Sequence, residues 1–415
     1  MLDLEESYMK AYERFIKYIS INTQSDENSG THPSTSAQFE LAKVLVDELH
    51  DMGVDASVDD KCYVMAHLPA TPGYEDRPTL GFISHMDSAP AYSGEGIKPV
   101  FCENYDGGDV TYPCGKVMKV ADFPFLKDLA GETLITSDGT TLLAADDKAG
   151  VAEIMTAISV ITEENRAHGP IAIAFTPDEE IGEGADNFDV KAFGADFAYT
   201  VDGGDVGQIE YENFNAADAK IEITGVSVHP GSAKDVMINA LNVAHELHGM
   251  LPEEKRPEHT EGYEGFFHLV GMSGDCSRAK LHYIIRDHDR QKFEEMKSFM
   301  KHCADSINER YGNGTVVLTL SDSYYNMKER IADHMHLIRT AEKAIEAVGL
   351  KSTAIPIRGG TDGARLSYMG LPCPNLGTGG FNFHGPFECI TVERMDRACG
   401  VIVNIIEEYA ENVIQ

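Results

Sequence analysis

The fold is decided by the stretch TLGFISHMD, residues 79–87, in which an apolar run ends abruptly in a histidine and an aspartate. The runs IAIAFTP (171–177) and FAYTVDG (197–203) repeat this pattern, each apolar and each ending at acidic residues. A helical segment from Gly150 to about Thr162 separates the first run from the second. Short apolar runs that alternate with helices are typical of a buried α/β sheet. Because ligands gather at the carboxyl ends of such strands, we expect the functional residues there.

Two amphipathic helices precede the first run. The apolar face of the first helix comprises Leu4, Tyr8, Met9, Tyr12, Phe15, Ile16 and Ile19, which fall on one side at helical spacing. The second helix follows Pro33, where Thr35 and Gln38 have the spacing of a capping box, and Gly53 ends it. Its buried stripe comprises Leu41, Leu45, Leu49 and Met52.

The pattern changes near Asn213. From there the chain predicts a strand, a helix, two strands, a second helix and a final strand, the β-α-β-β-α-β order of a ferredoxin-like sandwich. After Tyr325 the α/β pattern resumes with one long helix over residues 327–349. We therefore predict an α/β catalytic domain, residues 1–212 and 325–415, whose mixed sheet is flanked by helices. Residues 213–324 form an inserted ferredoxin-like α+β domain.

Composition excludes several functional classes. The 415 residues are too many for one compact core, which agrees with two domains. With 68 acidic and 34 basic residues the formal net charge is -34, so the surface repels nucleic acid and anionic membranes. No apolar run reaches the length of a membrane span. The start, MLDLEESYMKAYERF, lacks the basic and apolar regions of a signal peptide, and the 8 cysteines form no C-x-x-C pair. We expect reduced thiols and a cytoplasmic location.

Five polar motifs stand at or near predicted strand ends: SHMD (84–87), AADDK (144–148), DEE (178–180), VDG (201–203) and NFHGP (382–386). Each alone is weak, because single histidines are usually structural and acidic pairs are common in so acidic a chain. Together they offer two histidines and several carboxylates, a complete ligand set for two divalent cations. Buried carboxylates that repel one another would take up protons unless cations compensate them.

Neighbouring residues within these motifs suggest a division of work. His85 and Asp87 share one face of a strand, so Asp87 can accept the second imidazole N–H and orient His85. Glu179 and Glu180 follow a strand and can point apart, one toward a metal ion and the other toward a water that it deprotonates. His32, His50, His334 and His336 are expected to be solvated side chains on helical or loop surfaces.

Longer segments around the motifs are distinctive: GTTLLAADDKAG, FTPDEEIGEGAD, TVDGG, GVSVHPG, IRGGTDGARLS and NFHGPFE. With SHMD they resemble the two-zinc metallopeptidase family that includes carboxypeptidase G-like enzymes, dipeptidases and succinyl-diaminopimelate desuccinylase. The resemblance covers essentially the whole chain. It implies a zinc-exopeptidase-like catalytic domain with an inserted lid or dimerisation domain. Within the family, sequence segments such as FTPDEEIG and SVHPGSAK most resemble those of aminopeptidases that release the amino-terminal residue of tripeptides.

The resemblance also implies residue roles. The implied metal ligands are His85 and Asp202 for one ion, Glu180 and His384 for the other, and Asp146 as the bridge between them. Asp87 would orient His85, and Glu179 would be the general base. The Asp146–Asp147 peptide bond is expected to be cis. The implied cofactor is a pair of divalent ions, Zn²⁺ by preference, although Co²⁺ and Mn²⁺ suit the same ligands.

Substrate recognition is less determined by the sequence. The resemblance makes His229 a donor to the oxyanion, but a histidine packed beside the turn-forming Pro-Gly fits the sequence equally well. Arg286 and Arg358 each suit a substrate carboxylate, with a slight preference for Arg358, and each also suits a structural salt bridge. Expected substrates are short peptides with a free amino terminus.

Three alternatives remain. A sister enzyme (dipeptidase, carboxypeptidase or N-acyl amino-acid amidohydrolase) would have the same metal site and different specificity contacts. A protein that binds metal or peptide without turnover is disfavoured by the presence of Glu179. A dinucleotide-dependent oxidoreductase would need a G-x-G-x-x-G fingerprint that the chain lacks. The insert would act as a lid or as a homodimer interface, and the sequence does not choose between them.

Overall fold

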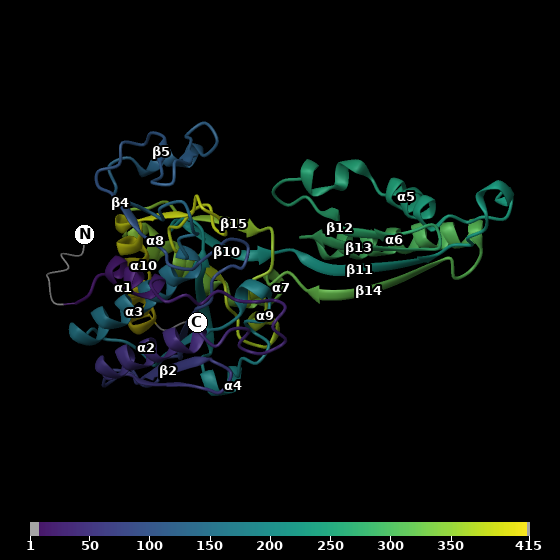
Figure 1. The fold of residues 1–415 in the computed structure, drawn as a ribbon. Helices are drawn as coiled ribbons and strands as arrows, with labels where there is room; N and C mark the ends of the chain where they lie inside the picture. Colours follow the sequence, from purple (N-terminus) through teal and green to yellow (C-terminus); the bar gives the residue numbers. More distant parts are fainter. Residues whose placement is uncertain (1–7, 413–415) are drawn as a thin grey trace. The chain divides into compact units, whose positions relative to one another are not determined.

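The computed structural model describes residues 8–412 and divides into two compact units (Figure 1). Unit 1 comprises Met1–Tyr211, Arg330–Ile355 and Thr361–Gln415, and unit 2 comprises Glu212–Glu329 and Pro356–Gly360. The chain therefore builds most of unit 1 first, then unit 2, and returns to complete unit 1. Leu4, which we placed on the first helix, lies outside the described residues.

The core of unit 1 is a mixed sheet of eight strands in the order β1-β2-β8-β3-β9-β16-β10-β15. Their bounds are β1 Asp55–Val58, β2 Val64–Leu68, β3 Leu80–His85, β8 Ile171–Thr176, β9 Phe197–Gly203, β10 Gln208–Asn213, β15 Thr353–Ile357 and β16 Asn375–Gly377. Strands β8, β3, β9 and β16 are parallel neighbours. Strands β3, β8 and β9 are the three apolar runs, and every residue of β3 and β8 is buried, which confirms the predicted α/β class.

Helices cover this sheet. Helices α1 (Ala11–Ile19), α3 (Ala145–Glu163) and α10 (Val392–Glu411) contact one another, and α3 also contacts β3 and β9. This approach is close, because a Cβ on Gly150 of α3 would lie 2.0 Å from the carbonyl oxygen of Val201. Helix α2 (Gln38–Asp51) packs on β1 and β2, and the short α4 (Val190–Phe193) and α9 (Asp362–Tyr368) contact β8 and β9. Among the described residues, no helix has both the length and the apolar character required to cross a bilayer.

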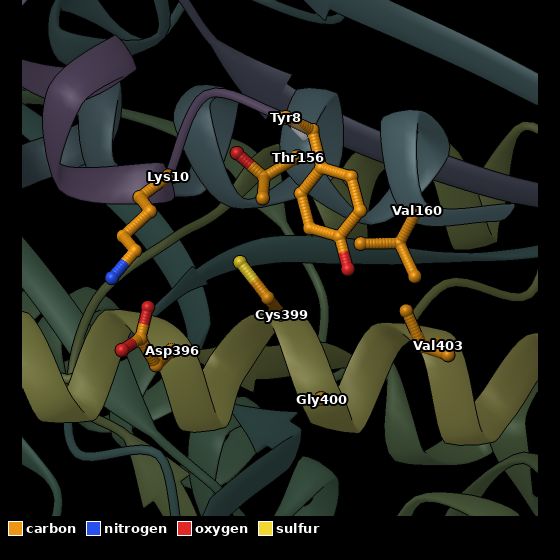
Figure 2. A pocket seen from close by; sticks show the side chains of 8 residues that line it. All are labelled: Tyr8, Lys10, Thr156, Val160, Asp396, Cys399, Gly400 and Val403. Carbon is orange, nitrogen blue, oxygen red and sulfur yellow. The ribbon is translucent and has the colours of Figure 1, made fainter. Parts of the chain in front are cut away.

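The segment before α1 is held against two of these helices. Figure 2 shows a pocket lined by Tyr8 and Lys10 of this segment together with residues of α3 and α10: Thr156, Val160, Asp396, Cys399, Gly400 and Val403. The Tyr8 hydroxyl donates to Glu164 just after α3. Within the predicted apolar face of α1, Phe15 and Ile19 are buried, whereas Met9 before the helix is exposed.

Unit 1 also contains two small sheets. One has three strands in the order β17-β7-β4, with bounds Cys389–Thr391, Leu134–Thr136 and Val100–Cys102. The other pairs β5 (Val110–Thr111) with β6 (Val117–Met118). Both lie against a separate apolar cluster around Tyr112 and Leu126, the latter in the 3-10 helix η1 (Pro124–Leu129).

Unit 2 is a sheet covered by two helices. Its elements are β11 (Asn215–Thr224), α5 (Ala240–Met250), β12 (Phe266–Gly274), β13 (Arg278–Asp287), α6 (Arg290–Tyr311) and β14 (Val316–Tyr324). All pairs are antiparallel, in the order β12-β13-β11-β14. Apolar residues of α5 and α6 share one core with the sheet. This element order is the expected ferredoxin-like arrangement.

Two local predictions are wrong. Helix α2 begins at Gln38 without a side-chain cap, because its N-cap residue is Ala37 rather than Thr35. The Thr35 hydroxyl donates to the carbonyl of Gln24. Residues 327–349 do not form one helix but α7 (Lys328–Ile331), the 3-10 turn η6 (Ala332–His334) and α8 (His336–Ala347). At the start of α8 the Leu337 carbonyl accepts from the Tyr199 hydroxyl of β9.

Candidate metal centre

Residues from five separate segments of unit 1 meet around His85, the last residue of β3. The His85 Nε2 atom lies 2.9 Å from Oδ1 of Asp146, at the start of α3, and 3.5 Å from Oδ1 of Asp202, on β9. The side chain of His85 is almost fully buried. A parallel sheet brings the carboxyl ends of β3 and β9 to the same edge, which explains this meeting.

Asp146 connects two groups of side chains. While its Oδ1 faces His85, its Oδ2 lies 3.0 Å from Nε2 of His384. The same His384 nitrogen is 2.9 Å from Oε2 of Glu180. One carboxylate therefore stands between a group made of His85 and Asp202 and a group made of Glu180 and His384.

The turns that present these residues have unusual backbone conformations. Ala144 before Asp146, Asp178 before the glutamates, and His384 itself all have φ between 57° and 64°, the left-handed region that non-glycine residues rarely adopt. The Asp146–Asp147 peptide bond is cis, as the family resemblance implies. Left-handed conformations of this kind cluster at functional sites, where the surrounding structure holds them.

Asp87 ties the histidine to the glutamates. Its buried carboxylate accepts the backbone N–H of Glu179 at 3.0 Å and that of Glu180 at 3.2 Å. Its Oδ1 also lies 3.2 Å from Nδ1 of His85. One side chain thus fixes the 3-10 turn η2 (Glu179–Ile181) against the end of β3.

The pKa values show how crowded the charges are. Burial, and then Asp202, raise the pKa of Glu179 well above its ordinary value. Burial, and then Asp146, raise the pKa of Glu180 to about 7. Burial also raises the pKa of Asp202. Hydrogen bonds that His384 donates to the carboxylates of Asp146 and Glu180 raise the pKa of His384 to about 11. Burial would lower the pKa of His85, but Asp202 and Asp146 outweigh it and raise that pKa.

These residues fit a pair of divalent cations. The buried carboxylates whose pKa values are raised have too few positive groups near them. Bound cations would supply that positive charge and lower these pKa values again. The Glu180 Oε1 atom is buried and has no hydrogen-bond partner among the described residues, although ligand atoms of His85, Asp146 and Glu180 lie within 4.8 Å of one another. Imidazole and carboxylate are ordinary ligands of Zn²⁺ and similar ions.

One supporting residue escaped the sequence analysis. Glu388 accepts the backbone N–H groups of Leu143 and Ala144 through Oε2 and that of Asp146 through Oε1. Burial raises its pKa to about 7. Glu388 ends the segment NFHGPFE, but a glutamate in so acidic a chain gives no signal of its own.

The three predicted substrate residues lie in unit 2. His229 is exposed, and its Nδ1 accepts the N–H of Gly231. The Arg286 guanidinium stacks on Tyr324 at 4.8 Å, and its buried Nη1 has no hydrogen-bond partner within residues 8–412. By contrast, Arg358 donates to the carbonyl oxygens of Gly262, Glu264 and Thr260.

The chain is similar to known peptidases at several levels. A family model described as a peptidase dimerisation domain matches residues 211–315. Peptidase T of Clostridium novyi (strain NT) is 60% identical over 402 residues, which cover 96% of this chain and 98% of that protein. The aminopeptidase PepT of Bacillus cereus ATCC 10987 superposes with a TM-score of 0.78 at 25% identity, covering 97% of this chain and 98% of that one.

A more distant structure shares the fold. The YXEP protein of Bacillus subtilis, a dinuclear metal-binding peptidase of the M20 family, superposes with a TM-score of 0.66 at 14% identity, covering 97% of this chain and 99% of that one. Full-length identity of 60% to a peptidase T shows the family directly. The chain belongs to the peptidase T family of the metal-dependent M20 peptidases.

Proposed function

We propose that this chain is an aminopeptidase that releases the amino-terminal residue of tripeptides at the cluster around Asp146. The observation that carries the proposal is the position of that carboxylate, with one oxygen toward His85 and the other toward His384. High identity to peptidase T supports the substrate class. The inserted dimerisation domain supports a homodimer formed through unit 2.

The side-chain atoms of the five proposed metal ligands lie 2.9–3.5 Å from one another in neighbouring pairs. The proposed ligands are His85 and Asp202 for one ion, Glu180 and His384 for the other, and Asp146 for both. With two imidazoles and three carboxylates, Zn²⁺ is the proposed native ion, and Co²⁺ or Mn²⁺ would fit the same donors. When bound, the ions would polarise the scissile carbonyl and lower the pKa of the attacking water toward about 7.

Glu179 is the proposed general base. Its turn is fixed by the two N–H groups that Asp87 accepts, so its carboxylate is held on a rigid support rather than on a free loop. It takes the proton of the attacking water and returns that proton to the nitrogen of the leaving amine. Asp87 acts by orienting His85 and this turn.

Substrate contacts are proposed for unit 2. His229, exposed on the insert, is the proposed donor to the developing oxyanion. For the carboxylate of the peptide, the contacts favour Arg286 over Arg358, the reverse of our preference from sequence. Donors of Arg358 are engaged by the carbonyls of residues 260–264, whereas Arg286 has a free Nη1 within the described chain.

The decisive variant is Glu179→Gln, which keeps the shape of the side chain and removes its basicity. We expect a fall in kcat for Leu-Gly-Gly by about 10²–10⁴, the usual contribution of a general base. Metal content should stay at the wild-type value. Glu180→Gln, in contrast, should lose metal together with activity, and Glu75→Gln on the surface should change neither. Wild-type turnover by Glu179→Gln would disprove the assignment.

The amino-terminal specificity has a separate test. Leu-Gly-Gly, its N-acetylated form and a dipeptide would be compared at equal concentration. We expect cleavage of the free tripeptide and none of the blocked one. Equal rates on both would instead indicate a sister amidohydrolase with the same metal site.

A cytoplasmic location is also proposed. All 8 cysteines are free thiols in the structure, and five of them are buried. Free thiols persist where the medium is reducing. Fractionation of cells followed by immunodetection should find the chain with cytoplasmic markers, and recovery outside the cell would contradict this.

A further inference from the structure

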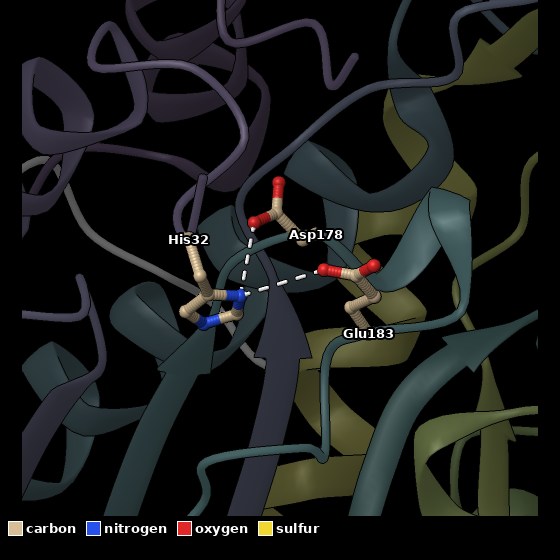
Figure 3. A group of neighbouring side chains, drawn as sticks. All are labelled: His32, Asp178 and Glu183. Carbon is tan, nitrogen blue, oxygen red and sulfur yellow. Dashed lines mark ion pairs between the residues drawn. The ribbon is translucent and has the colours of Figure 1, made fainter. Parts of the chain in front are cut away.

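A second metal-ligating cluster lies in unit 1, and two of its members, Asp178 and Glu183, flank the turn that carries Glu179 and Glu180. It consists of His32, Asp178 and Glu183, and Figure 3 shows the two carboxylates approaching the same imidazole nitrogen. The His32 Nδ1 atom lies 3.3 Å from Oδ2 of Asp178 and 3.8 Å from Oε2 of Glu183. The cluster shares no residue with the proposed catalytic ligands.

His32 is not the solvated histidine that we expected from sequence. Its side chain is 16% exposed and stacks on the ring of Tyr63 at a centroid distance of 5.7 Å. Both ring nitrogens are buried, and neither has a hydrogen-bond partner among the described residues. Although Nδ1 is near Asp178, the geometry is not that of a hydrogen bond. Buried polar atoms without partners call for an explanation such as a bound water or ion.

Asp178 is prepared as a ligand. It is fully buried, and its Oδ2 accepts the backbone N–H of Ser34 at 2.7 Å. Its Oδ1 accepts from the Ser34 hydroxyl and from Nε2 of Gln38. Hydrogen bonds of this kind fix a metal-ligating carboxylate while leaving its second lone pair free. Oδ2 therefore still has a lone pair for the direction of His32.

The distances suit a shared cation. Two ligand atoms that each lie about 2.0–2.2 Å from one ion in tetrahedral geometry are roughly 3.3–3.6 Å apart. The Nδ1–Oδ2 separation of 3.3 Å falls in this range, and the Nδ1–Oε2 separation of 3.8 Å is slightly wider. Glu183 is the exposed member, with 47% of its side chain accessible, so it can close this small gap by rotating.

The surroundings provide access and charge. An open polar hollow of about 260 Å³ lies over the cluster and is lined by His32, Glu183, Asp26, Glu27 and Thr31, among others. Apart from the histidine, the charged residues of this lining are acidic. A cation can therefore enter from solvent and find a negative field with room for the water ligands that complete its coordination.

We propose that His32, Asp178 and Glu183 bind a third divalent transition-metal ion, such as Zn²⁺, that is structural rather than catalytic. The ion links the segment before α2 to the residue that precedes Glu179. It thereby anchors the residues that flank the turn, whereas Asp87 accepts N–H groups within the turn. Loss of the ion would loosen this turn without removing any of the catalytic ligands.

The test is a count of bound ions in the full chain. Protein stripped with a chelator is dialysed against a series of free Zn²⁺ concentrations, and metal per chain is measured by mass spectrometry. We expect saturation at three ions for the wild type and at two for His32→Gln and for Glu183→Gln. Loss of a ligand should weaken the third site by more than about 100-fold, since loss of a mere supporting contact costs 10–100-fold.

A matched control distinguishes this site from nonspecific metal binding to surface histidines. His282 pairs with Asp218 at 2.8 Å in unit 2, and residues 8–412 offer no third ligand there, so His282→Gln should still hold three ions. Circular dichroism identifies any variant that fails to fold. If His32→Gln does not fold, the exposed Glu183→Gln decides the question.

Several outcomes would overturn the proposal: a wild type that saturates at two ions, a folded His32→Gln or Glu183→Gln that keeps the third, or loss of the third ion in His282→Gln. Failure of the catalytic site would look different. In that case the wild type would bind a single ion, and this ion would still disappear in Glu183→Gln.

Discussion

Replacing Glu388 by glutamine tests whether one buried carboxylate builds the turn that presents Asp146. At pH 8, above its pKa of about 7, Glu388 is ionised and accepts three backbone N–H groups at 2.7–3.0 Å. An amide keeps only one accepting oxygen. Its NH₂ group must then face at least one of the three donors, either that of Asp146 or those of Leu143 and Ala144.

A buried N–H group left without an acceptor costs about 1–3 kcal/mol. In domains of 150–250 residues, each kcal/mol lowers Tm by about 2–4 °C, so Glu388→Gln should lower Tm by roughly 2–12 °C. Because Asp146 is the proposed bridge, the displaced turn should also reduce metal content below that of the wild type. Calorimetry at pH 8 and metal analysis on the same sample measure both effects.

Glu393→Gln is the matched control. Glu393 also accepts a backbone N–H, that of Thr133 at 2.7 Å, and its side-chain hydrogen bonds within residues 8–412 go to Thr133 rather than to the Asp146 turn. It should lose stability while keeping its metal. Wild-type Tm and full metal content in Glu388→Gln would refute the reasoning, as would equal metal loss in both variants.

Two further predictions concern α3. Burial, then Asp147 and Asp396, raise the pKa of Glu153 well above its ordinary 4.5, and its carboxylate oxygens lack partners in the described part of the chain. The folded chain thus keeps a proton that the unfolded chain releases, so wild-type stability falls by up to about 1.4 kcal/mol per pH unit above pH 4.5 until the folded pKa is passed. The Tm of Glu153→Gln relative to that of the wild type should therefore rise between pH 5 and 8 in thermal melts. A constant difference in Tm over this pH range would contradict the prediction. Gly150→Ala places a Cβ against the Val201 carbonyl, and we expect a loss of at least about 1–3 kcal/mol by denaturant titration; an unchanged midpoint would show that α3 can shift.

Much of the fold could be predicted because its signals are local. The runs that became β3, β8 and β9 are continuous apolar stretches, and burial on both faces of a sheet requires that pattern. The element order of the insert could be predicted equally well, because apolar residues in each strand and helix of unit 2 recur at the spacing typical of that element. The break between α7 and α8 could not be predicted, because residues 327–348 contain no glycine or proline that would mark it.

The candidate site divides in the same way. Residues at strand ends, such as His85 and Asp202, could be named as candidates because the sheet itself determines where they go. Glu388 was not, and Asp178 was marked only as part of the DEE motif without a role, since the importance of both comes from backbone N–H groups that distant segments offer. His32 was misjudged for a similar reason: its burial depends on Tyr63 and on the loop around Glu183, neither of which is near it in sequence.

The position of Asp87 has a consequence for how this enzyme can vary. One carboxylate supports both a histidine proposed to hold metal and the backbone of the residue proposed to move protons. A substitution of Asp87 would therefore change the metal affinity and the rate of proton transfer at the same time. Any substitution there should degrade both together, so improved variants must arise from changes made elsewhere in the molecule.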